Sequence, residues 1–293
     1  MRSKHLLAWN GYHLELGEKT CVMGILNVTP DSFSDGGHFY SIESAVAQGK
    51  KLAEEGAGIL DIGGESTRPF SDPVTVEEET RRVVPVIEEL ASRVHIPISI
   101  DTTKAVVAKR ALDAGASIIN DIGALRLDPD LTGVAAKAGV PVILMHMLGT
   151  PGTMQIDPVY EDLFAEIGAF LEDAVSRAIA GGIQRNRIIV DPGIGFGKTL
   201  EHNLKLIGGL DRFSPLGVPI LAGPSRKAFI RRILNDGPDK DISPELPIVE
   251  TGTQAAVAAS ILHGAHIVRV HDVANTVATV KIIDAFERNK PNK

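Results

Sequence analysis

Eight short apolar runs recur along the chain, and a helix-like pattern follows each of them. Short, continuous apolar runs are typical of strands buried in a parallel sheet. Their regular alternation with helices predicts a (β/α)8 barrel, an α/β architecture for which 293 residues is an ordinary length. The runs are Val22–Val28, Ile59–Gly63, Ile98–Asp101, Ser117–Asp121, Val142–His146, Arg187–Asp191, Pro219–Ala222 and His266–Val270.

The segments between these runs have the apolar spacing of helices. Several are followed by a glycine where a left-handed C-cap is favoured, namely Gly56, Gly115, Gly139 and Gly264. The longest irregular piece, residues 235–247, has three prolines and four acidic residues, and we interpret it as an insertion in the seventh connection. The predicted helices are Ile42–Glu55, Val76–Arg93, Lys104–Ala114, Pro129–Ala138, Tyr160–Ala180, Glu201–Gly208, Glu250–His263 and Val273–Arg288.

The N-terminal residues predict a separate small element. Asn10-Gly11 is a strong turn signal between two short apolar stretches, so residues 5–20 predict a β-hairpin that plugs one end of the barrel. We therefore expect one domain over residues 1–293, with the hairpin in 1–20 and the barrel in 21–288. A doubly wound open sheet is the competing α/β architecture. It has a glycine-rich first crossover, which the loop after the Cys21 strand does not supply.

Composition excludes several classes of function. Hydrophobic residues make up 44% of the chain, which is enough for a large core, and the net charge of −7 argues against a broad nucleic-acid surface. Cys21 is the only cysteine, so no intramolecular disulfide can form. The apolar stretch Leu6–Trp9 is too short for a signal peptide, and no window has the length of a membrane helix. We expect a cytoplasmic protein without nucleic-acid or membrane partners.

Every predicted strand ends in a polar or charged residue. The active site of a (β/α)8 barrel is built at the carboxyl ends of its strands and in the loops that follow them. The coincidence over eight strands therefore predicts a site at that end of the barrel. The strand ends are Asn27, the segment 65–69, Asp101, Asn120-Asp121, His146, the segment 191–193, the segment 225–227 and the segment 269–272.

Each of these residues also has a purely structural interpretation. An Asp or Asn at a strand end often caps the next helix. Capping and ligand binding are equally supported for Asp101; capping is favoured for Asp121 and disfavoured for Asp191, because a proline follows it. His146 between two methionines is as consistent with a core histidine as with a functional one. Arg269 lies inside an apolar strand, where a buried charge requires a partner.

The residue types at the strand ends suit a particular ligand chemistry. Asp101, Asn120 and Asp191 offer carboxylate and amide groups that match a flat heterocycle with several N–H donors, such as an aminopyrimidinone. The segment 225–227, Arg269 and His271 come from the seventh and eighth strands, where such barrels commonly bind phosphate.

Asn27 adds a third kind of group to this edge of the barrel. Its side-chain oxygen is a suitable ligand for a hard ion such as Mg2+ that also holds phosphate. The sequence thus predicts a site for a heterocycle, a phosphate group and a divalent cation.

Several motifs, spread from the first to the eighth strand, resemble the dihydropteroate synthase family. The first two motifs and Ser-Arg-Lys are specific to it, whereas the Asp and Asn strand ends are shared with other pterin-binding barrels. Ala228 departs from the pattern, because many relatives have a serine there. The motifs are Asn-Val-Thr-Pro-Asp-Ser-Phe-Ser-Asp-Gly-Gly (27–37), Asp-Ile-Gly-Gly-Glu-Ser-Thr-Arg-Pro (61–69), Ser-Ile-Asp-Thr (99–102), Asn-Asp (120–121), Asp-Pro-Gly-Ile-Gly-Phe-Gly-Lys (191–198), Ser-Arg-Lys (225–227) and Arg-Val-His-Asp (269–272).

The resemblance implies an activity. Members of this family condense 6-hydroxymethyl-7,8-dihydropterin diphosphate with 4-aminobenzoate and release diphosphate and 7,8-dihydropteroate, a step of folate biosynthesis. Sulfonamides mimic the second substrate. The resemblance also implies a homodimer formed through helices on the later side of the barrel, and loops at 31–37 and 66–74 that order over the substrates and exclude water.

The resemblance further implies a role for each site residue. Catalysis is assigned to Asp101, Lys227 and Arg269. The diphosphate subsite consists of Asn27, Arg269 and His271, with Mg2+ at Asn27. The pterin subsite consists of Asp101, Asn120, Asp191 and Lys227. The aminobenzoate subsite consists of Phe33, Thr67, Arg68, Pro69 and Ser225.

Two other functions are compatible with parts of this pattern. A methyltetrahydrofolate–corrinoid methyltransferase is also a barrel that binds a pterin through Asp and Asn strand ends, but it needs no diphosphate site. A non-catalytic pterin-binding or scaffold protein would be indicated by the loss of Asn27, Lys227 or Arg269, and all three are present. Both alternatives are therefore disfavoured.

Overall fold

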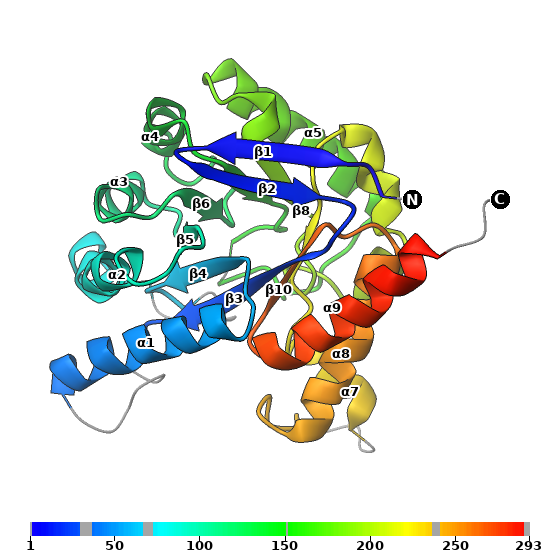
Figure 1. The fold of residues 1–293 in the computed structure, drawn as a ribbon. Helices are drawn as coiled ribbons and strands as arrows, with labels where there is room; N and C mark the ends of the chain where they lie inside the picture. Colours follow the sequence, from blue (N-terminus) through cyan, green and yellow to red (C-terminus); the bar gives the residue numbers. More distant parts are fainter. Residues whose placement is uncertain (1, 30–36, 67–72, 151, 236–240, 290–293) are drawn as a thin grey trace.

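Eight parallel strands close on one another to form a barrel (Figure 1). The computed structural model describes residues 2–29, 37–66, 73–150, 152–235 and 241–289. The strand order is β8-β7-β6-β5-β4-β3-β10-β9, and a parallel bridge between Val190 and Ile220 joins the two ends of this sheet. The barrel strands are β3 (Cys21–Asn27), β4 (Ile59–Gly63), β5 (Ile98–Asp101), β6 (Ile118–Asp121), β7 (Val142–Met145), β8 (Ile188–Asp191), β9 (Leu221–Ala222) and β10 (Ile267–Val270).

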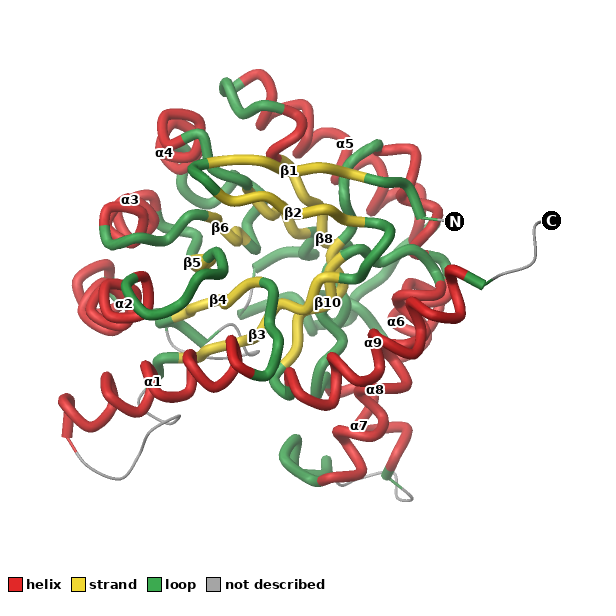
Figure 2. The backbone as a smooth tube through the Cα atoms, viewed as in Figure 1, coloured by secondary structure: helices red, strands yellow, loops and turns green. Residues whose placement is uncertain are grey.

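Helices surround the barrel strands on the outside (Figures 1 and 2). Their apolar faces pack against strands that are themselves almost completely buried, as the five buried residues of β4 illustrate. None of the helices in the described ranges has the length and apolar character needed to cross a membrane. The helices are α1 (Gly37–Glu54), α2 (Val76–Ala91), α3 (Ala105–Asp113), α4 (Asp130–Ala138), α5 (Leu163–Ala180), α6 (Leu200–Gly208), α7 (Ala228–Leu234), α8 (Pro247–Leu262) and α9 (Val273–Arg288).

The predicted (β/α)8 architecture is confirmed, and the doubly wound sheet is excluded by the closure between β8 and β9. Helix α7 was not expected, because its seven residues follow the Ser-Arg-Lys loop directly and are too few for a clear helical period. Helix α1 begins at Gly37, five residues before its predicted start. The seventh strand has two residues, shorter than the predicted 219–222.

The predicted N-terminal hairpin is also confirmed. Strands β1 (His5–Trp9) and β2 (Tyr12–Leu16) pair antiparallel, and Asn10 and Gly11 both have the positive φ that a two-residue hairpin turn requires. Three side chains of the hairpin are buried, namely Leu7, Trp9 and Leu16. The hairpin lies in front of the barrel strands in Figure 1. The hairpin covers the N-terminal end of the strands, since β1 packs beside the 3-10 turn Arg185–Arg187 that leads into β8.

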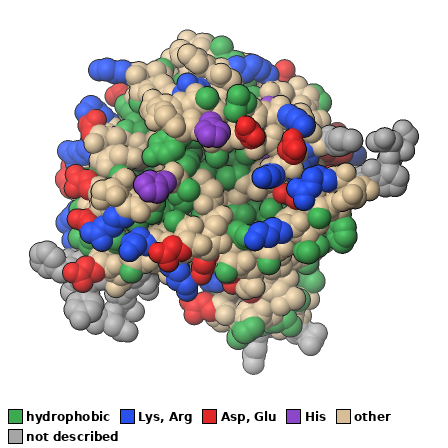
Figure 3. All heavy atoms as spheres, viewed as in Figure 1, with side chains coloured by type: hydrophobic (Ala, Val, Ile, Leu, Met, Phe, Trp, Pro, Cys, Tyr) green, Lys and Arg blue, Asp and Glu red, His purple; other side chains and the backbone are tan. Residues whose placement is uncertain are grey.

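A buried ion pair between Arg2 and Asp284 of α9, at 2.8 Å, holds the segment before β1 against the barrel. Because the hairpin covers one end of the barrel, the opposite end is the one left for a site. On the face shown in Figure 3, basic and acidic side chains are interspersed rather than gathered in one basic patch. The carboxyl ends of the strands are therefore where the chemistry of this chain concentrates.

Candidate active site

Arg269 is the centre of a charged network inside the barrel. Its Nε lies 2.6 Å from Oδ2 of Asp61 on β4, and its Nη2 lies 2.7 Å from Oδ2 of Asp101 on β5. The side-chain amide of Asn120 on β6 donates to the same Oδ2 of Asp61 at 3.0 Å. The sequence predicted that Arg269 needs a partner; the structure supplies two carboxylates, and the predicted residues Asp101, Asn120 and Arg269 come together.

Burial sets the protonation chemistry of this network. Burial raises the pKa of Asp101 to about 7; Arg269 opposes that rise, and the nearby charge of Asp61 adds to it. Burial on its own lowers the pKa of Arg269, but the carboxylates of Asp61 and Asp101 outweigh it, so that pKa is raised. Arg269 therefore keeps its charge and favours the ionised form of Asp101.

Asp191 and Lys227 form a second part of the site on the neighbouring strands. Asp191 ends β8 and accepts a hydrogen bond from the backbone N–H of Gly193 at 2.7 Å. Lys227 Nζ donates to the carbonyl of Ile194 at 2.8 Å and lies 3.8 Å from the centre of the Phe196 ring. Burial lowers the pKa of Lys227 to about 7 and raises that of Asp191, and each charge favours the ionised form of the other.

Glycine is required where Lys227 crosses the turn after β8. A Cβ on Gly195 would lie 2.5 Å from Cδ of Lys227, and the φ of Gly195 is +82°. Both the contact and the conformation disfavour any other residue at this position. The glycines of the motif at 191–198 thus allow the backbone to lie close to the side chain of Lys227. Their spacing differs from that of a phosphate-binding P-loop.

Lys198 and His146 form a buried pair; the sequence left the role of His146 open and did not assign Lys198 to the site. Lys198 Nζ lies 3.0 Å from Nδ1 of His146 and donates to the carbonyl of Phe196 at 2.9 Å. Burial, and then the charge of Lys198, lower the pKa of His146 to about 2, so its imidazole is neutral and accepts. Burial likewise lowers the pKa of Lys198 to about 7, while Asp191 opposes this. His146 therefore anchors the turn that carries Phe196.

The loops after β9 and β10 meet through Ser225 and His271. Ser225 Oγ lies 2.9 Å from Nδ1 of His271 and accepts from the His271 backbone N–H at 3.3 Å. Between Ser225 and Lys227, Arg226 has a φ of +57°, and its N–H donates to Thr253 Oγ1 of α8 at 3.1 Å. This left-handed residue turns Ser225 and Lys227 towards the site.

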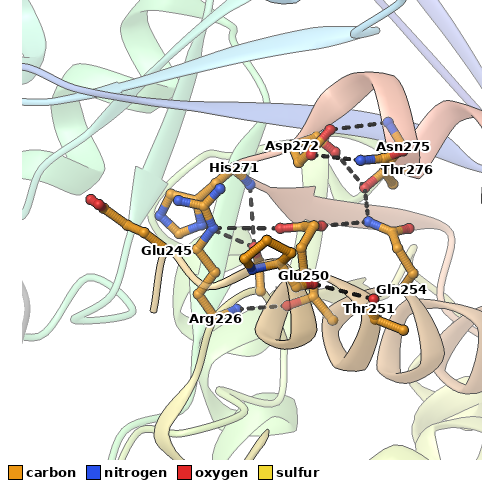
Figure 4. Close-up of polar contacts among 12 residues, drawn as sticks. Arg226, Glu245, Glu250, Thr251, Gln254, His271, Asp272, Asn275 and Thr276 are labelled. Atoms are coloured by element: carbon orange, nitrogen blue, oxygen red, sulfur yellow. Dashed lines mark hydrogen bonds and ion pairs between the residues drawn. The ribbon is translucent and has the colours of Figure 1, made fainter. Parts of the chain in front are cut away.

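A chain of polar side chains supports this turn from helices α8 and α9 (Figure 4). Arg226 pairs with Glu250 at 3.5 Å, and Gln254 donates to Glu250 at 2.7 Å and to Thr276 at 3.0 Å. Thr276 in turn donates to the carbonyl of Asp272 at 2.7 Å. The loops after β9 and β10 are thus tied to the same pair of helices.

Asn27 ends β3 beside Gly63, which neighbours Asp101 in the barrel. Within the described ranges, the side-chain amide of Asn27 makes no hydrogen bond, and no group of three or more His, Cys, Asp or Glu residues is arranged to hold a metal ion. One amide oxygen fits a hard cation that takes its other ligands from phosphate oxygens and water. The residues present therefore fit Mg2+ held together with a phosphate ligand better than a metal caged by protein.

The structure settles two of the capping alternatives. Asp121 accepts backbone hydrogen bonds from Gly123 at 2.7 Å and Leu125 at 2.6 Å, so its role is local. The favoured capping of the next helix is wrong, because the N-cap of α4 is Pro129. Asp101 does not cap α3, whose N-cap is Lys104. Asp61 was missed as a network member, because it lies in mid-strand rather than at a strand end. The acid in an otherwise apolar strand was the available signal.

Four residues expected at the second-substrate subsite lie outside the described residues: Phe33, Thr67, Arg68 and Pro69. The flanks of the second segment are described. Glu65 accepts from the N–H of Val74 at 3.0 Å, and Lys104 pairs with both Glu65 and the buried Glu79. The two ends of the segment 66–73 are therefore held together beside the site.

Comparison with known proteins places this barrel in a class. Residues 23–271 match the family described as "Pterin binding enzyme". The chain is 45% identical to the dihydropteroate synthase of Escherichia coli (strain K12) over 272 residues, which is 93% of each chain. The chain belongs to the dihydropteroate synthase family.

Two solved structures are similar over nearly their whole length. Xanthomonas albilineans dihydropteroate synthase with 4-aminobenzoic acid has a TM-score of 0.89 and 45% identity, covering 99% of this chain and 100% of that one. A Yersinia pestis dihydropteroate synthase–sulfonamide drug complex has a TM-score of 0.89 and 42% identity, covering 97% and 100%. The predicted family and enzyme class are confirmed, in preference to a corrinoid methyltransferase or a scaffold protein.

Replacing the central arginine tests the charged network. Arg269→Leu leaves two buried carboxylates without their counter-charge, so we expect a loss of about 3 kcal/mol in the free energy of unfolding at pH 8. Without Arg269 the pKa of Asp101 in the folded protein rises further above the unfolded value of about 3.9. The folded state then binds more protons, so its stability falls as pH rises through that range. The loss relative to wild type should therefore be smaller at pH 5.5.

Urea unfolding at the two pH values measures this difference. Arg93→Leu, which removes an exposed pair with Glu89, is the control and should cost less than about 1 kcal/mol at either pH. If Arg269→Leu lost the same free energy of unfolding at both pH values, the assignment of Arg269 as the counter-charge of the buried carboxylates would be contradicted.

Proposed function

We propose that this chain condenses 6-hydroxymethyl-7,8-dihydropterin diphosphate with 4-aminobenzoate to give 7,8-dihydropteroate and diphosphate. The observation that carries the proposal is the position of Arg269, which pairs with Asp61 and Asp101 and lies on β10 two residues before His271. Membership of the dihydropteroate synthase family and the similarity to a relative crystallised with 4-aminobenzoic acid support it.

In this proposal the pterin occupies the acidic part of the site. Asp101, Asn120 and Asp191 accept hydrogen bonds from its N–H groups, and Lys227 donates to its carbonyl or ring-nitrogen acceptors. These side chains come from strands β5, β6 and β8 and from the loop after β9, so they surround one volume at the barrel mouth. The pKa of Lys227 is about 7, as expected for an ammonium group held in a pocket from which water is excluded.

The diphosphate lies against Asn27, Arg269 and His271. Within the described part of the chain, Nη1 of Arg269 makes no hydrogen bond, so its N–H groups remain for phosphate oxygens. Mg2+ bound at Asn27 would neutralise charge on the leaving group. Arg269 and His271 stabilise the same charge as it develops, which is the main electrostatic contribution of the protein.

The second substrate lies between the diphosphate side and the two loops. Ser225, Phe33, Thr67, Arg68 and Pro69 form its subsite, and sulfonamides compete there, in keeping with the relative crystallised with such a drug. The ends of the segment 66–73 are held by Glu65 and Lys104. Those anchors support a loop that excludes water from the reaction.

The reaction breaks the C–O bond to diphosphate and forms a C–N bond to the arylamine. Electron deficiency builds on the pterin methylene carbon, and the carboxylate of Asp101, whose ionised form Arg269 favours, stabilises it. Lys227 and Arg269 complete the set of catalytic residues. A neutral amine attacks, and its proton leaves to solvent or diphosphate, so no strong general base is needed.

The two-substrate assay tests this function. Diphosphate release should require the pterin diphosphate, 4-aminobenzoate and Mg2+ together, and chelation by EDTA should abolish it reversibly. The product should be 7,8-dihydropteroate by mass spectrometry. Release at the full rate without 4-aminobenzoate, or no product under any of these conditions, would refute the proposal.

Lys227→Ala tests the pterin subsite. Removing a buried cation that contacts the ligand should weaken pterin binding by roughly 100-fold, because charge-assisted hydrogen bonds contribute about 1.5–3 kcal/mol each. Circular dichroism should show an unchanged fold. Lys109→Ala, which removes an exposed pair with Asp113, is the control and should bind as wild type. A wild-type dissociation constant for Lys227→Ala would contradict the role.

We also propose a cytoplasmic homodimer in which residues 1–293 form one domain per chain. Helices α8 and α9 pack together and expose Ile248, Ile282 and Phe286, each more than half accessible. Equilibrium sedimentation should give twice the chain mass of 31.2 kDa. Ile282→Glu should shift the protein towards monomer, whereas Ile156→Glu, on an exposed loop, should not. A wild-type monomer at about 100 µM would contradict the dimer.

A further inference from the structure

Asp61 occupies a position that the reaction as proposed does not use. It is fully buried in the middle of β4, and its Oδ2 accepts from Asn120 on β6 and from Arg269 on β10. In the barrel order these two strands lie two places from β4, one on each side. One carboxylate oxygen therefore links two ligand-facing side chains across the barrel interior.

The hydrogen bond to Asn120 fixes which end of its amide faces the ligand. An ionised carboxylate can only accept, so the NH2 group of Asn120 must point to Asp61. The carbonyl Oδ1 of Asn120 is then presented as an acceptor on the other side. That orientation suits an N–H donor of a heterocycle, and the opposite orientation would repel it.

The bond to Arg269 fixes the plane of the guanidinium. Its Nε is held by Asp61 and its Nη2 by Asp101, each below 2.8 Å. The five N–H groups of arginine form a rigid fork, so two fixed bonds determine where the others point. Nη1, which makes no bond within the described residues, is left on the side available to a phosphate ligand.

A purely stabilising role explains Asp61 poorly. Its second oxygen, Oδ1, is buried without a hydrogen-bond partner in the described part of the chain, which carries a desolvation cost. Replacing a buried ion pair by apolar side chains of the same volume is often neutral or stabilising. The arrangement is understandable if it orients Asn120 and Arg269 rather than holding the barrel together.

We propose that Asp61 is a positioning residue that sets, before any ligand binds, the acceptor face of Asn120 and the phosphate-facing edge of Arg269. This inference rests on the proposed pterin and diphosphate subsites. It places both parts of the first substrate, but not 4-aminobenzoate, under the control of one side chain that contacts neither.

The test compares Asp61→Asn with Asp121→Asn. Both variants replace a buried aspartate of a barrel strand by its isosteric amide, but among the described residues Asp121 accepts only from the backbone of Gly123 and Leu125. The amide of Asp61→Asn can present N–H to Asn120 and Arg269, so both lose their fixed orientation. Titration calorimetry with the pterin diphosphate and steady-state kinetics with both substrates separate the effects.

We expect Asp61→Asn to weaken pterin diphosphate binding roughly 10- to 100-fold, by analogy with the loss found when groups that orient metal-binding side chains are removed. The KM for 4-aminobenzoate should change less than about threefold. Asp121→Asn should bind the pterin diphosphate as wild type, whatever its loss in melting temperature. Wild-type binding by Asp61→Asn, or an equal loss in both variants, would overturn the inference. No binding by the wild type would refute the proposed function instead.

A measurement on the unsubstituted protein covers the case in which Asp61→Asn does not fold. In protein labelled with 15N-asparagine, the side-chain NH2 of Asn120 should exchange slowly with water, with one proton shifted downfield by the carboxylate. Both features should be present without ligand and persist when pterin is added. A rapidly exchanging Asn120 amide that becomes ordered only with pterin would overturn the inference.

Discussion

The buried charge of Arg269 is the constraint on which the rest of the site depends. A guanidinium inside a barrel of apolar strands is tolerated only with counter-charges at hydrogen-bond distance, and Asp61 and Asp101 supply them at 2.6 and 2.7 Å. The side-chain amide of Asn120 donates to the carboxylate of Asp61. Asp101, Asn120 and Arg269, which are proposed to bind the pterin and the diphosphate, are therefore parts of one network rather than independent contacts.

The fold supplies the geometry that this network needs. Parallel strands bring their carboxyl ends to one mouth, while the hairpin β1–β2 covers the other end. Around that mouth, burial pushes the pKa values of Asp101, Lys198 and Lys227 to about 7. In each case an opposite charge opposes the effect of burial, Arg269 for Asp101 and Asp191 for both lysines, so a ligand that adds charge or removes water changes these pKa values.

The barrel could be predicted from the sequence because the alternation of strands and helices is a local pattern, which can be recognised without knowledge of tertiary contacts. Arg269 could be marked as a buried charge, but its partner Asp61 could not be identified, since the contact between side chains of β4 and β10 depends on the tertiary structure. The same holds for Lys198 and His146, which are 52 residues apart. Helix α7 was not predicted because its seven residues are too few to show a helical periodicity. The functional assignment came from motifs, since fold alone is shared by many chemistries.

The central claim is that one preorganised network holds both halves of the first substrate. A crystal structure of the chain with a non-hydrolysable pterin diphosphate, Mg2+ and 4-aminobenzoate tests it most directly. The account predicts the heterocycle between Asp101, Asn120 and Asp191, the diphosphate against Arg269 and the metal at Asn27, with the bonds of Asp61 to Asn120 and Arg269 unchanged from the ligand-free protein. A diphosphate bound away from Arg269, or an Arg269 that leaves Asp61 to reach it, would contradict the account.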